Sequence, residues 1–384
     1  MEILLKEIVN PDNTKTSIYK RKITAPALKH IAGVDQLRYV FALWVFFTHG
    51  GNPPLFAGHA KTPIFDFIDH LYGWSVNGQA AVMGFFIVSG LCIHYPNIRR
   101  DSFDIKSFYA ARFLRLSLPL FACLAIAKFL NFYHPNGFLR VVPMWTLYCE
   151  AIYYVVYPFV LWVVKKDYLI QLIISTGFLS VVLIIIWSDQ RSMYFHEIGG
   201  GGFLNWKAAL LAFPCWLLGV LLAERLSVAS IINKIVNEKH GIWLWRTGAL
   251  LLSVITFPLY RYALYYHFIN KPIIGLFFTS QLTILLFGLY AFFWIEREVI
   301  NINFGKALPS YRLEKMGAAS YSLYLVHLLV IWLFEKISPV YFSGYLSNWL
   351  LLFVTLHIAV FLFFIVFEKP SHKLSKFCAN ALRN

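Results

Sequence analysis

The chain has 384 residues, of which 59% are apolar and only 14% are charged. A soluble domain is about half apolar and about a quarter charged, so this composition excludes a soluble globular enzyme, a disordered protein and a collagen-like fibre. The net charge is +15. In a soluble protein that charge would suggest nucleic acid as a partner, but here the basic residues lie between apolar runs, which indicates contact with lipid headgroups instead.

Ten apolar stretches predict an all-α polytopic bundle of about ten transmembrane helices, because only helices and closed barrels satisfy backbone polar groups in lipid. Runs such as 169–187 lack the alternation of a barrel strand. We expect a basic cytosolic tail over 1–33, a transmembrane domain over 34–370 and a short cytosolic tail over 371–384. The ten stretches are 34–51, 80–96, 116–133, 143–164, 168–188, 206–223, 242–260, 273–295, 317–335 and 346–367.

The distribution of Lys and Arg predicts the orientation of these spans. If the N-terminus is cytosolic, 25 of the 34 basic residues fall in cytosolic segments and 8 lie outside or at outer span ends. This asymmetry is typical of cytosolic loops and predicts that both termini are cytoplasmic. The five cysteines lie mostly in apolar runs without CxxC spacing, so we expect neither a disulfide framework nor a zinc site.

The first span contains two ionisable residues, Arg38 and His49, eleven positions apart. On a helix this spacing is about 20° past three full turns, so both side chains share one face, about 16 Å apart along the axis. An ionisable residue inside a span is costly and marks a functional site by default, so this face is expected to line a cavity. The alternative is that Arg38 reaches the headgroups while His49 lies at the outer interface.

The fourth span contains Glu150, with Tyr154 and Tyr157 on the same helical face. A carboxylate at this depth needs a partner, and we expect His49 or Arg38 to supply it. The alternative is a structural glutamate that hydrogen-bonds to a neighbouring helix.

The predicted inner loop 97–115 is basic, and it contains Arg112 and Arg115 three residues apart. On a helix the two guanidiniums would form one cationic face. Guanidiniums bind phosphate oxygens in a bidentate manner, so this face suits a polyphosphate ligand. The alternative is the ordinary excess of positive charge on the cytosolic side.

The first outer loop, 52–79, carries residue types that bind metals. They are His59, Asp66, Asp69 and His70. The two histidines do not have the i,i+4 spacing that places both on one face of a helix. We therefore predict no metal site.

Taken in order, these residues resemble the integral-membrane acyltransferase-3 family, which includes bacterial O-acyltransferases of O-antigen, exopolysaccharide and antibiotics. Arg38, ten intervening residues and His49 are similar to the family's signature on the first span. Leu91 replaces the usual Phe, and Thr146 replaces the usual Ser. The resemblance spans about 35–370, and its other motifs lie at Gly84–Leu91, Arg112–Arg115 with Pro119, Trp145–Glu150, Ser320–His327 and Phe367–Pro370.

The resemblance implies transfer of an acyl group, most often acetyl, from cytosolic acyl-coenzyme A (acetyl-CoA) to a hydroxyl of a glycan or glycolipid at the bacterial inner membrane. It implies no metal and no nucleic-acid partner, and it leaves homo-oligomerisation open. His49 would be the general base, oriented by Glu150, while Arg38 would hold the donor or the developing oxyanion. An acyl-histidine intermediate is equally compatible. The residues expected to bind the donor are Arg112, Arg115, Ser89 and Tyr154.

Two other functions fit the same residues. The acceptor could be a cytosolic small molecule such as a macrolide, which would enter from the inner side. The protein could also be a proton-coupled transporter in which Arg38, His49 and Glu150 form a relay. Such transporters have paired broken spans in two related halves, and the sequence does not display that symmetry.

Overall fold

The computed structural model describes residues 23–55, 62–100, 102–132, 144–187, 206–238, 241–269, 280–305, 307–337 and 345–382. In these ranges the chain is helical and contains no strand. The elements are α2 (Val34–Gly50), α3 (Pro63–Trp74), α4 (Gly78–His94), η2 (Tyr95–Asn97), α5 (Ile105–Phe129), α6 (Met144–Lys165), α7 (Leu169–Trp187), α8 (Trp206–Arg225), α9 (Ala229–Val236), α10 (Ile242–Ile269), α12 (Ser280–Phe304), α13 (Tyr311–Gly317), α14 (Ser320–Ile337), α15 (Leu346–Phe363), η6 (Phe364–Glu368) and α16 (Lys369–Ala381).

Within these ranges, seven helical segments are long and apolar enough to cross a membrane. The predicted all-α membrane fold is therefore confirmed. A helix overlaps each of the ten predicted stretches, while the count of ten spans and the side of each terminus stay predictions. The seven segments are Pro63–Asn97, Ile105–Phe129, Met144–Lys165, Leu169–Trp187, Trp206–Arg225, Ser320–Ile337 and Leu346–Ala381.

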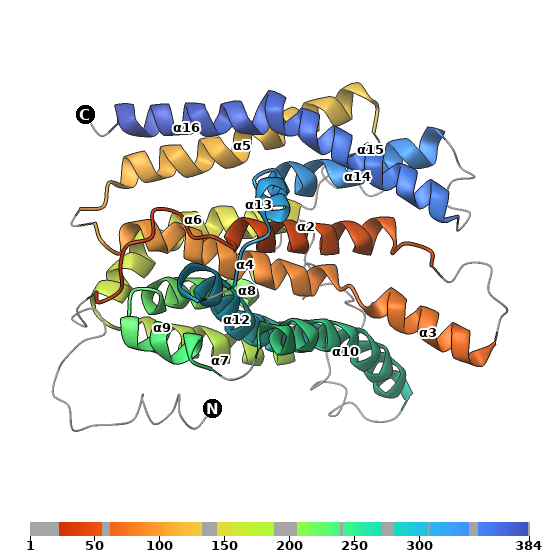
Figure 1. Ribbon diagram of the computed structural model, residues 1–384, viewed down its shortest axis with the longest axis horizontal. Helices are drawn as coiled ribbons and strands as arrows, with labels where there is room; N and C mark the ends of the chain where they lie inside the picture. Colours follow the sequence, from red (N-terminus) through yellow and green to blue (C-terminus); the bar gives the residue numbers. More distant parts are fainter. Residues whose placement is uncertain are drawn as a thin grey trace.

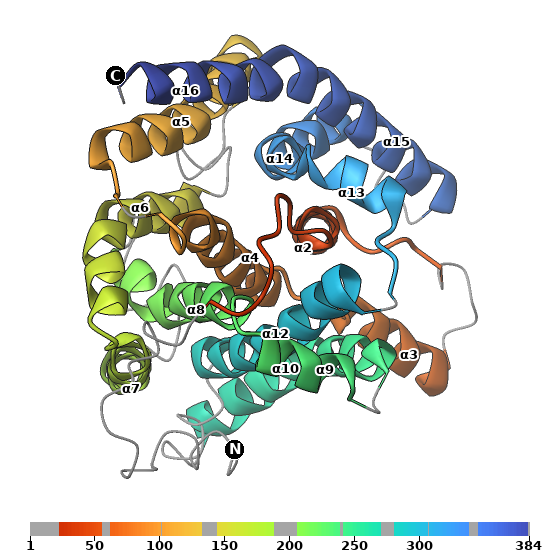
Figure 2. The ribbon, with the colours of Figure 1, turned by 60° about the vertical axis from the view of Figure 1, so that its left-hand side comes forward.

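Most of the long helices run along the long axis of the molecule, with α3 at one end and α9 at the other (Figure 1). We call these the α3 end and the α9 end. The helix α2 lies in the middle of the bundle (Figure 2), where it packs against α4, α13 and α14. This central position explains why most side chains of the first predicted span are buried although it carries charged residues.

The helices α4 and α8 cross at two glycines, Gly90 and Gly219. A Cβ atom on Gly90 would lie 2.1 Å from the carbonyl oxygen of Trp216, and one on Gly219 would lie 1.9 Å from that of Ile87. Small residues at such a crossing allow membrane helices to approach closely. The contact fixes the rotation of α4 about its axis, and with it the direction of the neighbouring Ser89.

The predicted inner loop 97–115 is helical for its second half, because α5 begins at Ile105. The Asp104 carboxylate accepts hydrogen bonds from the backbone N–H groups of Lys106 (3.0 Å) and Ser107 (3.3 Å) and caps the helix. Arg112 and Arg115 therefore lie on a helix rather than in a loop, as a shared cationic face requires.

Two further segments differ from the sequence expectation. The outer loop 52–79 contains the helix α3, whose first turn is capped by Thr62 and begins with Pro63. The last span does not end at 367, because η6, one π-helical turn, continues it into α16. The predicted tail 371–384 is thus largely helical. Of the loop residues considered as metal ligands, His59 and the side chain of His70 lie outside the described residues.

The described part of the predicted N-terminal tail, residues 23–33, lies against the bundle. The N–H groups of Thr24 and Ala25 donate to the carbonyl oxygen of Ser227 at 3.1 and 3.2 Å. Arg99 donates from Nη2 to the carbonyl oxygen of Ala25 at 2.7 Å, and Ala25 itself is buried. This segment therefore enters α2 from a fixed direction.

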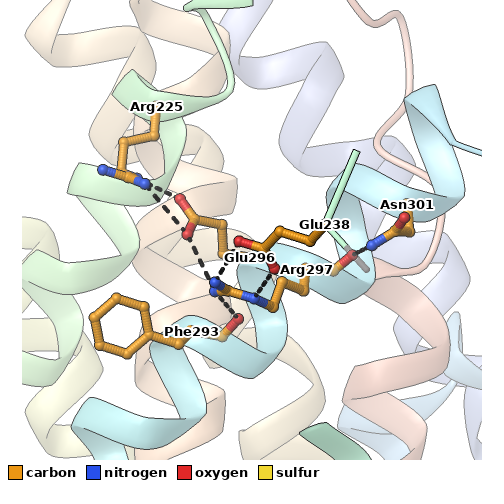
Figure 3. Close-up of polar contacts among 6 residues, drawn as sticks. All are labelled: Arg225, Glu238, Phe293, Glu296, Arg297 and Asn301. Atoms are coloured by element: carbon orange, nitrogen blue, oxygen red, sulfur yellow. Dashed lines mark hydrogen bonds and ion pairs between the residues drawn. The ribbon is translucent and has the colours of Figure 1, made fainter. Parts of the chain in front are cut away.

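Three consecutive residues of α12, Glu296, Arg297 and Glu298, form the core of what we call the α12 charge cluster. Figure 3 shows Glu296 paired with Arg225 of α8, and Arg297 donating from Nε and Nη2 to Glu238, both at 2.8 Å. Both glutamates of α12 are only 1% exposed. A buried carboxylate needs such a partner, so the cluster binds α12 to α8 and to the segment that follows α9.

The third member of the cluster fixes α2. Glu298 accepts a hydrogen bond at 3.0 Å from Nε of Arg246 on α10, and another at 3.1 Å from Nε2 of Gln36 on α2. The side-chain oxygen of Gln36 accepts from the backbone N–H of Ser310 at 3.1 Å. Because Gln36 is buried two residues before Arg38, these bonds set the position of α2 at the α9 end of the bundle.

Candidate active site

A cavity of about 160 Å³ lies between α2, α4, α5, α6 and α14. Its wall includes six of the seven residues that sequence reasoning assigned to the site, while the seventh, His49, lies elsewhere. The six residues are Arg38, Ser89, Arg112, Arg115, Glu150 and Tyr154. Residues from four different helices, up to 116 positions apart in the chain, are thus gathered around one space.

The wall of the cavity is rich in arginine. Arg38 of α2 is held by Asp35, with Nη1 3.3 Å from Oδ1. Arg112 and Arg115 are half-buried, and within the described part of the chain neither makes a hydrogen bond or an ion pair. The guanidinium carbon of Arg112 lies 5.8 Å from the centroid of the Phe108 ring. Each guanidinium has five N–H donors, so this part of the cavity suits an anionic ligand with several acceptor oxygens.

Glu150 has different partners from those predicted. Its Oε1 accepts hydrogen bonds from the Ser89 hydroxyl at 2.8 Å and from the Tyr154 hydroxyl at 2.5 Å. Among the described residues, neither His49 nor Arg38 hydrogen-bonds to it. The structure thus shows neither the expected bond to His49 nor one to Arg38, and the bond from Ser89 of α4 matches the alternative of a glutamate bound to a neighbouring helix.

His49 lies in the last turn of α2, towards the α3 end, and its side chain is exposed. Its Nδ1 is 2.9 Å from the carbonyl oxygen of Val45 and 3.3 Å from Nε2 of His327 on α14. The two imidazole ring centroids are 5.2 Å apart. The side chain therefore faces α14 across a helix contact. Sequence reasoning did not give His327 a role, although the motif Ser320–His327 was a signal that could have identified it.

An aromatic residue of the cavity wall, Tyr324, contacts the imidazole of His327. Tyr324 belongs to the cavity wall, and its ring centroid is 6.0 Å from those of Phe85 and His327. Its hydroxyl shares a short hydrogen bond with the hydroxyl of Thr146. Tyr324 is thus a residue of the cavity wall that also contacts His327, and Thr146 of α6 holds its hydroxyl.

The residues of the closing motif support α14. Glu368 is fully buried, and its Oε2 accepts hydrogen bonds from the backbone N–H of Ser322 at 2.9 Å and from the Ser322 hydroxyl at 2.5 Å. Ser322 is the third residue of α14, where backbone N–H groups lack partners within the helix. A carboxylate at a helix N-terminus is also favoured by the helix dipole. Glu368 therefore caps the helix that carries Tyr324 and His327.

Beside Arg38, three residues bring ligating atoms within 4.8 Å of one another: His30, Asp35 and Glu314. Both carboxylates have protein partners, since Asp35 binds Arg38 and Glu314 accepts a hydrogen bond from the backbone N–H of Gly33. Burial raises the pKa of Glu314, and the neighbouring Asp35 carboxylate raises it further, while the Gly33 N–H lowers it. The cluster is therefore accounted for by contacts within the protein.

Together, these features define a multi-pass membrane protein with a basic cavity between its helices. Residues 31–368 match the family profile described as an acyltransferase domain. The chain therefore belongs to the acyltransferase-3 family and is a membrane acyltransferase, which confirms the resemblance inferred from its motifs. No curated protein and no solved structure matches the chain.

Proposed function

We propose that the protein transfers an acyl group, in the first instance acetyl, from cytosolic acyl-CoA to a hydroxyl of a cell-surface glycan or glycolipid at the bacterial inner membrane. The observation that carries the proposal is the pair of guanidiniums, Arg112 and Arg115, which face the cavity of an acyltransferase without a partner among the described residues. Coenzyme A is a donor with clustered phosphates, and arginine forks match phosphate oxygens.

The size of the cavity supports a divided donor site. Pockets that bury a drug-sized ligand have about 300–1,000 Å³, whereas this one has about 160 Å³. Only the slender pantetheine arm of CoA would enter, with the phosphates at the arginine side. The hydroxyls of Ser89 and Tyr154 donate to Glu150, so their oxygens keep lone pairs that can accept from the amide N–H groups of that arm.

His49 would act as the general base. The acceptor oxygen attacks the thioester carbon while its proton passes to Nε2 of His49, and Arg38, about 16 Å away along α2, steadies the donor. When the C–S bond breaks, the CoA thiolate takes the proton from the imidazolium. The exposed position of His49 at the α3 end supports entry of the acceptor from that end. Arg112 and Arg115 lie in the first half of α5, which begins on the predicted cytosolic side, and this position supports entry of the donor from the cytosol.

The experiment uses the full chain in lipid nanodiscs with ¹⁴C-acetyl-CoA and a glycolipid fraction from the host membrane. We expect label in the glycolipid, and a loss of about 10²–10⁴-fold in His49→Ala, the usual contribution of a general base. His30→Ala is the matched control, because the His30 side chain is 68% exposed and outside the cavity.

Three outcomes would contradict the proposal. Full activity of His49→Ala would remove the base assignment. Acetylation of a macrolide but of no glycan or glycolipid would favour the small-molecule alternative. Uptake of a solute into sealed vesicles, driven by a proton gradient and without covalent acylation, would favour the transporter.

A further inference from the structure

The imidazole of His327 is buried and has hydrogen-bond partners at both nitrogens. His327 is only 1% exposed. Nδ1 lies 2.8 Å from the carbonyl oxygen of Tyr324, and Nε2 lies 3.3 Å from Nδ1 of His49. The mechanism above gives this buried ring no role, and it occupies the position beside His49 that Glu150 was expected to fill.

The carbonyl partners determine which nitrogens carry hydrogen. A carbonyl oxygen only accepts hydrogen bonds, so Nδ1 of His327 carries a hydrogen and donates to Tyr324. In the neutral ring Nε2 is then an acceptor. In the same way, Nδ1 of His49 carries a hydrogen, because it lies 2.9 Å from the carbonyl oxygen of Val45. That hydrogen also faces the acceptor Nε2 of His327.

This tautomer leaves Nε2 of His49 as the basic nitrogen. None of the described residues hydrogen-bonds to that atom, and the side chain is exposed. The lone pair of Nε2 is therefore free for the hydroxyl of an acceptor. A wrong tautomer would place a hydrogen there and remove the base, which is why functional imidazoles are held by a partner at the other nitrogen.

We propose that His327 is the positioning residue of His49: together with the Val45 carbonyl it accepts from Nδ1 of His49, it orients the ring with Nε2 free, and its bond strengthens when His49 becomes an imidazolium. A hydrogen bond from a charged donor is about twice as strong as a neutral one. His327 gains and loses no proton in the cycle. The proton arrives from the acceptor at Nε2 of His49 and leaves from the same atom to the CoA thiolate.

The network around His327 extends from Glu368 of the motif Phe367–Pro370 to the cavity. Glu368 caps the first turn of α14 through Ser322, and Thr146 holds the hydroxyl of Tyr324. These bonds fix the rotation of α14 and its position along its axis. The distance between the rings of His327 and His49 is therefore fixed as well. The inference rests on the proposed function, since it gives the general base of that reaction its partner.

The test compares His327→Leu, which removes the acceptor, with His327→Gln, whose side-chain oxygen can accept from Nδ1 of His49. Both are measured as full chains in nanodiscs by CoA release from acetyl-CoA with the host glycolipid fraction, together with acetyl-CoA binding. We expect His327→Leu to lower kcat by roughly 10- to 100-fold, the size of effect seen when the hydrogen-bond partner of a metal-bound imidazole is removed. KM for acetyl-CoA should stay within about twofold, and His327→Gln should recover part of kcat.

The outcomes separate this inference from the proposed function. If His49→Ala is inactive while His327→Leu keeps the wild-type kcat, the positioning role is wrong and the general base stands. A loss in His327→Leu that raises KM and weakens acetyl-CoA binding to the same extent, without recovery in His327→Gln, identifies a merely structural residue and overturns the inference. If wild-type protein releases no CoA, the proposed function fails and this inference with it.

Discussion

Two groups of arginines in this protein have opposite surroundings. Arg225, Arg246 and Arg297 of the α12 charge cluster each pair with a carboxylate (Figure 3 shows two of them). Arg112 and Arg115 on α5 face the cavity, and in the described part of the chain they have no such pair. All five arginines lie in segments that the distribution of Lys and Arg assigns to the cytosol, so this distribution does not distinguish the two groups.

The difference separates stability from ligand binding. A charge that is removed from water needs compensation. In the α12 charge cluster the protein itself supplies it, because Glu296 and Glu298 are 1% exposed and bound to arginines from two other helices. At the cavity the compensation has to come from outside the chain, and we infer that a donor with phosphate groups supplies it. The two groups should therefore respond differently to the same kind of mutation.

The largest effect on stability is expected at the α12 charge cluster. Glu296→Leu leaves Arg225 without its partner, and breaking a buried pair costs about 3–5 kcal/mol. The Arg225 side chain keeps 24% exposure, so we expect about 3 kcal/mol, the lower end of that range. The free energy of unfolding, measured by reversible SDS titration, should fall by this amount. An unchanged free energy of unfolding would mean that the pair of Glu296 and Arg225 does not stabilise the fold.

At the cavity we expect an effect on binding rather than on stability. Arg112→Ala combined with Arg115→Ala should raise KM for acetyl-CoA by about 100-fold, since each charge-assisted hydrogen bond contributes about 1.5 kcal/mol at the lower end. Acetyl-CoA should protect Cys92 of the cavity wall from maleimide in wild-type protein but not in the double variant, with Cys378 as the reference thiol. A stability loss as large as that of Glu296→Leu would erase the distinction between the two groups.

The smallest effect is expected at Glu314 of α13, outside the candidate spans. Burial raises its pKa above the ordinary 4.5, so the folded protein holds a proton there that the unfolded chain has released. This contribution to stability is complete below pH 4.5 and is lost as the pH rises through the folded pKa. The apparent melting temperature of wild type should decline over that window relative to Glu314→Gln. Equal slopes would show that Glu314 titrates normally.

Much of the fold could be predicted because burial in lipid leaves a simple record in the sequence. Each of the seven candidate spans in the described ranges overlaps a predicted apolar stretch, since backbone groups in lipid require helices. The ends of the helices were harder. The start of α5 depends on the Asp104 cap within a basic segment, and α16 continues the last span through η6. Hydropathy does not register either feature, because capping bonds and π-turns occur in polar as well as apolar sequence.

The site was predictable where one helix carried the information. The shared face of Arg112 and Arg115 followed from helical spacing, and both residues line the cavity. The partner of Glu150 did not follow, because it depends on how α4, α6 and α2 are rotated against one another. The glycine crossing at Gly90 sets one of these rotations through backbone contact, and the sequence alone does not state which helix lies opposite.

The π-turn Phe364–Glu368 makes the register of the last helix sensitive to chain length. Ser371, Ser375 and Ala379 form the buried side of α16, which packs along α5. Each residue advances a helix by 100°, so deleting one residue of the turn would rotate α16 by about this angle about its axis. The lysines at 369, 373 and 376 would then face other directions, and Glu368 would lose its hydrogen bonds to Ser322 of α14. A one-residue insertion or deletion in this turn would therefore disturb the α5–α16 contact and the cap of α14 together.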